Sequence, residues 1–226
     1  MVAEIKQAFA AIGAELVIET AGNVFEIDVR QSATGEAFHM QYPWSDEITA
    51  EALDVKPIRR HLVLDVSGWR LPISGRFLCG HDEQHWFVAS LPFDRRTMTV
   101  RGAMEALKPE LVKRAQKRLG VKHRLHRRKT ASYVRQGEWF FLPRPMMHVG
   151  DRAIRGGELT REGGGKPHFV EWLFRAEGSG ETFVHGAVSH SDHATIYLQV
   201  WHRVVQNMEV RPKPVAENLT RMMYLD

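Results

Sequence analysis

The amino-acid sequence predicts an α+β fold made mostly of antiparallel β hairpins, with a short N-terminal helix and a basic pair of helices near residues 99–120. The main observation is that short stretches of alternating apolar and polar residues recur along the chain, separated by turn-forming residues. A second is that few stretches space their apolar residues three or four apart, as helices require. The 226 residues are 43% hydrophobic, and a chain of this length buries enough surface to fold without a disulfide or a metal.

The first predicted element is a helix over residues 2–12. Its apolar residues Ile5, Phe9 and Ile12 recur at intervals of three or four, so they fall on one face. Gly13 follows directly, and glycine is the residue expected just beyond a helix C-terminus. We therefore expect a short amphipathic helix that ends at this glycine.

The rest of the N-terminal half reads mainly as strands. Residues 24–30 alternate apolar and charged side chains, which is typical of a half-buried strand, and residues 35–43 are its expected partner. Residues 48–57 end in a proline and are expected to form one or two helical turns. Residues 61–66 indicate another strand, and residues 76–91 indicate a hairpin whose two apolar runs flank a polar turn.

The predicted basic pair of helices follows. Residues 100–107 carry apolar side chains at helical intervals. A second helix is expected to begin at Pro109 and to end before Gly120, because proline suits the first helical turn and glycine the position after the last. The apolar side chains of this second helix that we expect to face the core are Leu111, Ala115 and Leu119.

The C-terminal part again predicts strands. Residues 133–143 hold four aromatic side chains, and residues 168–175, 181–190 and 195–205 are rich in β-branched and aromatic residues. The glycine-rich residues 156–165 are expected to form a loop.

The chain is expected to consist of three segments: a β-rich N-terminal half over 1–95, a basic helical segment over 96–130, and a β-rich C-terminal half over 131–226. The three together form either one domain or more than one.

The single cysteine, Cys79, excludes an internal disulfide framework and is typical of a reducing compartment. The apolar runs are far shorter than the roughly 20 residues of a membrane span. We therefore expect a cytoplasmic protein with no membrane partner.

Positive charge is concentrated in one block. Residues 111–137 contain ten basic residues and no acidic residue, whereas the remainder of the chain has 21 basic and 27 acidic residues and a net charge of −6. Such asymmetry indicates a polyanionic partner, most often nucleic acid, although a solvated helix face gives a similar pattern. The basic residues of this block are Lys113, Arg114, Lys117, Arg118, Lys122, Arg124, Arg127, Arg128, Lys129 and Arg135.

The first functional hypothesis follows from this block: the chain binds nucleic acid by contacting the phosphate backbone. No motif indicates base-specific readout. The aromatic residues Trp139, Phe140 and Phe141 lie near the block, and aromatic side chains next to arginine can stack on bases, which slightly favours RNA or single strands. Aromatic residues in such a strand more often belong to the core, and that is the other interpretation. An alternative is a protein-interaction subunit that docks on an acidic partner.

Histidines are concentrated near the C-terminus. The turn at residues 191–194 predicts a hairpin in which His190 pairs with Thr195 and in which His185 and His202 are diagonal neighbours on one face. Asp192 and His193 then lie beside His190 at the tip of the hairpin. From the preceding strand, the side chains that can join this group are His168 and Glu171.

The second functional hypothesis is a hydrolase, most plausibly a nuclease, that uses these side chains. Imidazole and carboxylate groups bind divalent metals such as zinc or manganese, and a histidine pair can also serve as general acid and base because imidazole titrates near neutral pH. A structural role for each histidine is the remaining interpretation. The candidate catalytic residues are His185, His190, Asp192, His193 and His202.

Several known motifs are absent. Lys166 follows a glycine run but precedes proline, so the phosphate-binding loop pattern is not met. The string at residues 188–193 differs from the HxHxDH signature of metallo-β-lactamase-like hydrolases, because Val188 stands where the first ligand is required. These classes are excluded by the sequence.

Overall fold

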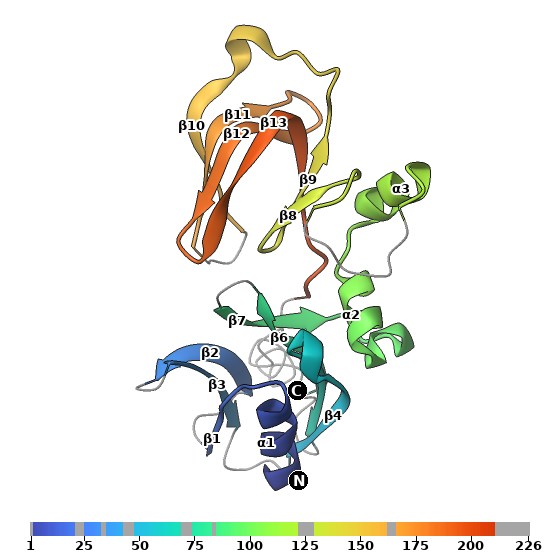
Figure 1. The fold of residues 1–226 in the computed structure, drawn as a ribbon, viewed down its shortest axis with the longest axis vertical. Helices are drawn as coiled ribbons and strands as arrows, with labels where there is room; N and C mark the ends of the chain where they lie inside the picture. Colours follow the sequence, from blue (N-terminus) through green and yellow to red (C-terminus); the bar gives the residue numbers. More distant parts are fainter. Residues whose placement is uncertain are drawn as a thin grey trace, which may run out of the picture. The chain divides into compact units, whose positions relative to one another are not determined.

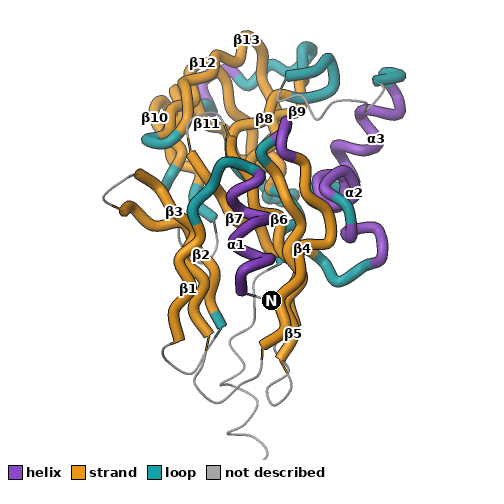
Figure 2. The backbone as a smooth tube through the Cα atoms, turned by 60° about the horizontal axis from the view of Figure 1, so that its bottom comes forward, coloured by secondary structure: helices purple, strands orange, loops and turns teal. Residues whose placement is uncertain are grey.

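The chain divides into two compact units in the computed structural model (Figure 1). Unit 1 comprises Met1–Leu107 and Met208–Asp226, and unit 2 comprises Lys108–Asn207. Both units are built mainly from antiparallel sheets with few helices (Figure 2), which confirms the predicted α+β class. The residues that the structure describes are 2–20, 25–32, 35–42, 48–68, 74–82, 85–121, 129–161 and 166–210.

Unit 1 contains a three-stranded sheet in the order β1-β3-β2. Strands β2 (Glu26–Ser32) and β3 (Gly35–Tyr42) form the predicted antiparallel hairpin. Strand β1 (Leu16–Thr20) adds to β3 in parallel. Strand β1 was not predicted from the sequence.

A four-stranded antiparallel sheet, in the order β4-β5-β6-β7, completes the strands of unit 1. Its first strand corrects a prediction: residues 48–57 were expected to be helical, but Ile48–Lys56 pair with β5 along their length. Cross-strand pairing therefore outweighs the local pattern there. The bounds of the four strands are β4 Ile48–Lys56, β5 His61–Gly68, β6 Ser74–Asp82 and β7 His85–Leu91.

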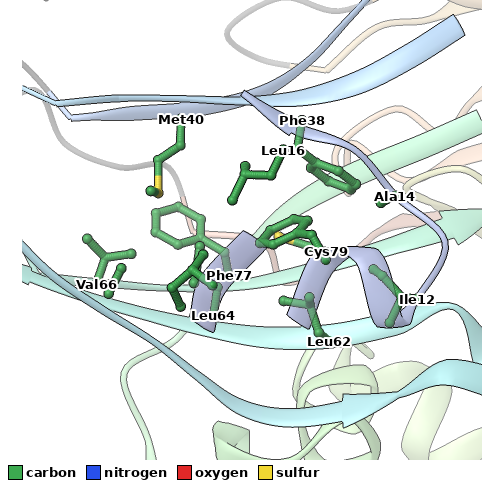
Figure 3. Close-up of a cluster of buried hydrophobic side chains, with 13 residues drawn as sticks. Ile12, Ala14, Leu16, Phe38, Met40, Leu62, Leu64, Val66, Phe77 and Cys79 are labelled. Atoms are coloured by element: carbon green, nitrogen blue, oxygen red, sulfur yellow. The ribbon is translucent and has the colours of Figure 1, made fainter. Parts of the chain in front are cut away.

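The main core of unit 1 lies between helix α1 (Val2–Ala11) and the two sheets. Figure 3 shows Phe38 and Met40 of β3 facing Leu62 and Leu64 of β5. Cys79 is buried in the same cluster, and this burial raises the pKa of its thiol well above the usual range. This cysteine is therefore an inert core residue rather than a nucleophile.

Helix α2 (Val100–Ala106) belongs to unit 1, where its apolar face packs on β5, β6 and β7. Helix α3 (Glu110–Arg118) belongs to unit 2. The predicted helical segment 96–130 therefore contributes one helix to each unit. The described 3-10 turns are Pro57–Arg59, Arg95–Met98 and Gly150–Arg152.

Unit 2 is organised around one antiparallel sheet in the order β10-β11-β12-β13-β9-β8. Residues of the predicted glycine-rich loop form part of β10, and residues 162–165 of that prediction lie outside the described residues. The bounds of the strands are β8 Val134–Gln136, β9 Trp139–Pro143, β10 Ile154–Leu159, β11 His168–Arg175, β12 Thr182–His190 and β13 His193–Gln206.

Helix α3 covers β9 with an apolar face, where Val112 and Ala115 contact Phe140 and Leu142. Leu119 was predicted to face the core, but it lies just after the helix and is 49% exposed. The helix has already ended at Arg118, so the periodicity that predicted a buried Leu119 no longer applies.

The register of the C-terminal hairpin also differs from the prediction. His190 pairs with His193 rather than with Thr195, and His202 pairs with Val184. Two register shifts interrupt the pairing of β12 with β13, and such bulges insert residues that a simple alternating pattern does not reveal. Among the described residues no helix is long and apolar enough to cross a membrane.

Candidate functional site

Three histidines converge at one end of the sheet of unit 2. His168 begins β11, His190 ends β12 and His193 begins β13. Phe169 pairs with Ser189, so the antiparallel register places their neighbours His168 and His190 level with each other, and His190 pairs directly with His193. One potential ligand atom from each of the three histidines lies within 4.8 Å of the other two. We call these three residues the histidine cluster.

The three imidazole rings are nearly parallel and stacked. The centroid of the His190 ring lies 4.1 Å from that of His168 and 4.9 Å from that of His193. The centroids of His168 and His193 are 5.9 Å apart. The interplanar angles lie between 25° and 29°, so all three rings share one orientation.

His168 is the buried member of the histidine cluster. It is fully buried, and neither ring nitrogen has a hydrogen-bond partner among the described residues. Burial, and to a lesser degree the neighbouring His190 and His193, lowers the pKa of His168 to about 3. The imidazole is therefore neutral at physiological pH, and its unpaired nitrogens cost about 1–3 kcal/mol of stability.

His190 is held by backbone groups on both sides of its ring. The amide N–H of Asp192 donates to Nδ1 at 3.1 Å, and Nε2 lies 3.3 Å from the carbonyl oxygen of Lys166. These contacts assign the proton to Nε2 and leave Nδ1 as the acceptor.

Asp192 forms an ion pair beside the histidine cluster. Its Oδ1 atom accepts hydrogen bonds from Nζ of Lys166 at 2.7 Å and from Oγ of Ser191 at 2.8 Å. Burial raises the pKa of Asp192, but these two hydrogen bonds and the charges of Lys166 and His190 together outweigh that effect, so its pKa is lowered. The Asp192 carboxylate therefore already accepts hydrogen bonds from Lys166 and Ser191, both at Oδ1.

The tight turn between β8 and β9 closes over the histidine cluster. Gln136 is buried, and its Nε2 atom donates to the carbonyl oxygen of Ala194, which fixes the turn to the start of β13. Gly137 follows with φ +54°, and a Cβ atom there would lie 3.0 Å from Nε2 of His193 and 3.3 Å from Nε2 of His168. The backbone thus approaches the two imidazoles as closely as only glycine permits.

Replacing Gly137 with alanine is expected to destabilise the chain more than the same change at Gly150. Both glycines have positive φ, but a Cβ at Gly150 meets nothing within 4 Å. The Gly150→Ala variant therefore carries only the backbone strain, about 1–2 kcal/mol, whereas Gly137→Ala adds contact with two imidazoles and is expected to lose about 1 kcal/mol more. Urea denaturation of both variants measures this difference, and equal losses would contradict the close approach.

Two of the predicted catalytic histidines lie away from the histidine cluster. His185 precedes His190 by five residues, about 16 Å along a strand, and its ring contacts Trp201 with centroids 5.6 Å apart. His202 is buried, and its Nδ1 atom lies 2.7 Å from the carbonyl oxygen of Val200. Burial lowers the pKa of His202. The structure therefore groups His190, Asp192 and His193 with His168, and does not bring His185 and His202 to them.

The predicted basic block is described only in part. Arg114, Lys117 and Arg118 are exposed on α3, Lys113 is half-buried, and Arg114 forms an ion pair with Glu110 at 3.2 Å. Those of the ten predicted contacts that lie outside the described residues are Lys122, Arg124, Arg127 and Arg128.

Two further members of the block lie near β8. Lys129 is exposed and forms an isolated β-bridge with Val134. Arg135 donates from Nε to the carbonyl oxygen of Gly137 at 2.8 Å, and its guanidinium lies over the ring of Phe140. Arg135 is thus engaged in holding the turn beside the histidine cluster.

The aromatic residues near the block are core residues rather than an exposed surface for stacking on bases. Trp139, Phe140 and Phe141 are all buried. The exposed aromatic side chains of unit 2 lie elsewhere: Phe169 is 51% exposed and Tyr197 is 75% exposed. Residues 139–141 therefore give no support to a preference for single strands or RNA.

No protein-family model, curated protein or solved structure matches this chain. Its functional assignment therefore depends on the residues themselves. From the sequence, His168 was predicted only as a residue able to join the hairpin tip, and Gly137 was not identified. The signal for His168 is its place at the start of a strong strand pattern that precedes the hairpin.

Proposed function

We propose that the chain binds nucleic acid by contacting the phosphate backbone, with the exposed cations of α3 at the interface. The observation that carries the proposal is the division of α3 into two faces. Val112 and Ala115 are buried against β9, while Arg114, Lys117 and Arg118 are exposed. We refer to these three cations as the α3 cation face.

The spacing of the α3 cation face suits a polyanion. Positions 114, 117 and 118 are separated by three and four residues, so their side chains are neighbours on a helix surface. Lysine and arginine that neutralise phosphates release condensed counterions, which gives affinity that is independent of base sequence and falls with salt. The proposal covers RNA and DNA alike, because residues 139–141 offer no exposed rings to favour single strands.

The triple variant Arg114→Ala, Lys117→Ala and Arg118→Ala is expected to weaken binding to a labelled 20-mer about tenfold or more at ~100 mM salt, because three phosphate contacts are lost. The slope of log affinity against log salt should fall by up to ~2.7 for a duplex. Fluorescence anisotropy with single- and double-stranded RNA and DNA measures both quantities.

A matched control removes the same net charge elsewhere. Arg59, Arg95 and Arg101 are exposed in unit 1, so their triple alanine variant also lowers the charge by three. We expect this control to keep most of the affinity. Equal losses in the two variants would mean that net charge alone attracts the probe. Absence of binding at low salt would overturn the proposal and leave an acidic protein as the candidate partner.

A second candidate function is hydrolysis at the histidine cluster, with α3 holding a polyanionic substrate. The specific observation in its favour is a neutral, buried imidazole beside His190 and His193, which are half-buried. Cleavage of a labelled oligonucleotide, measured with and without added divalent metal, tests this function. A folded His190→Ala variant that cleaves as fast as the unmodified chain would exclude it.

A further inference from the structure

The inference starts from the unpaired nitrogens of His168. Buried polar side chains in folded proteins nearly always have a hydrogen-bond partner. His168 is fully buried, and both of its ring nitrogens lack such a partner among the described residues. A neutral imidazole offers a lone pair, and in the part of the chain that the structure describes the rings stacked on it are two further imidazoles.

We propose that His168, His190 and His193 bind one divalent transition-metal ion of the zinc class. The three ligands come from the ends of three adjacent strands, so the sheet itself holds them together. The proposal concerns unit 2 alone and does not depend on nucleic-acid binding by α3.

The separations of the ligand atoms are compatible with a metal after small side-chain movements. The atoms lie within 4.8 Å of one another, whereas zinc–nitrogen bonds of about 2.0–2.1 Å place tetrahedral ligands roughly 3.3 Å apart. His190 and His193 are half-buried and can rotate, while His168 is fixed in the interior. A shift of one to two ångströms in the His190 and His193 rings therefore brings the three nitrogens to the separations that zinc requires.

The hydrogen bonds of His190 favour coordination through Nδ1. Its Nε2–H points to the carbonyl oxygen of Lys166, and metal-binding histidines commonly donate their second nitrogen to such a group. Coordination at Nδ1 exchanges one hydrogen bond, that from the amide of Asp192, for a bond to the metal.

The donor set selects the class of metal. Imidazole nitrogen suits zinc, copper, nickel and cobalt, whereas magnesium and calcium require oxygen ligands. The nearby carboxylate of Asp192 already accepts from Lys166 and Ser191. The only thiol of the chain, Cys79, is buried in the core of unit 1.

Three nitrogen ligands also leave one position open to water or a substrate, which is typical of catalytic rather than structural zinc sites.

The test is a titration of the full chain, freed of metal by a chelator and carrying no histidine tag. Isothermal titration with ZnCl2 is expected to show one ion per chain, and CoCl2 is expected to give the visible absorption of a nitrogen-ligated ion, while MgCl2 gives neither. The variants His190→Ala and His193→Ala should each weaken zinc binding at least 100-fold. His148→Ala and His185→Ala are the controls and should change it less than threefold.

Circular dichroism checks that each variant is folded, and His190→Asn and His193→Asn replace any alanine variant that is not. Absence of zinc binding by the unmodified chain would overturn the proposal. So would binding that His190→Ala and His193→Ala leave unchanged, or that the control variants weaken equally. Nucleic acid is not present in the titration, so failure here is independent of failure at the α3 cation face.

Discussion

A chain with leucine in place of His168 is expected to be at least as stable as the unmodified chain without metal, and to gain no stability from zinc. Leucine fills the buried position with an apolar side chain and removes two unpaired nitrogens that cost about 1–3 kcal/mol. The unmodified chain gains about 2.7 kcal/mol when zinc is present at 100 times its dissociation constant. Thermal unfolding with zinc or with a chelator measures both effects.

His39 supplies a matched control for this experiment. Its two ring nitrogens are also buried without a hydrogen-bond partner, but it lies on β3 in unit 1, away from any described group of metal-binding residues. His39→Leu should therefore keep the full response to zinc. A His168→Leu variant that is still stabilised by zinc would contradict the assignment of His168 as a ligand, and one that is strongly destabilised without metal would show that its nitrogens have partners.

Local sequence patterns predicted those parts of the fold whose partners are close in the chain. The hairpin of β2 and β3 and that of β6 and β7 follow from alternation around short turns. Strand β1 was missed because its five residues pair in parallel with β3, and the sequence of β1 does not specify that partner. Strand β4 was read as helical because its pairing with β5, which decides its conformation, is not visible in its own pattern.

The candidate site was predictable to the same degree. His190, Asp192 and His193 are close because a two-residue turn joins their strands, so proximity in the sequence was sufficient. The position of His168 depends on the register between β11 and β12. The position of Gly137 depends on the turn between β8 and β9, which are the last two strands in the order of the sheet. His185 and His202 remain electrostatic neighbours, as predicted, but the bulges between β12 and β13 change the pairing of these strands in a way that alternation does not reveal.

The basic block illustrates the limit of reading charge and composition together. Its cations and the aromatic residues at 139–141 are close in sequence and of the types that bind single strands. In the structure α3 exposes its cations, while the aromatic side chains fill the core below the helix and within the sheet. The composition therefore predicted the exposed cations of α3. It did not predict that the rings at 139–141 are buried, because the side of the sheet on which each ring lies depends on tertiary packing.

Replacing Phe141 with alanine is expected to lower the free energy of unfolding by about 3–5 kcal/mol, because a fully buried aromatic side chain is removed from the core. The control is Phe169→Ala in the same unit, where the ring is 51% exposed and the expected loss is below about 1 kcal/mol. Urea denaturation measures both losses.

The same pair of variants distinguishes a core role of Phe141 from a base-stacking role. At a temperature where Phe141→Ala remains folded, its affinity for a single-stranded 20-mer should equal that of the unmodified chain, because the ring lies inside unit 2 and cannot reach a base. Loss of a single stacked base typically costs about 1–3 kcal/mol of binding. A folded Phe141→Ala variant with such a loss, and with little change in stability, would mean that this ring contacts nucleic acid and not the core.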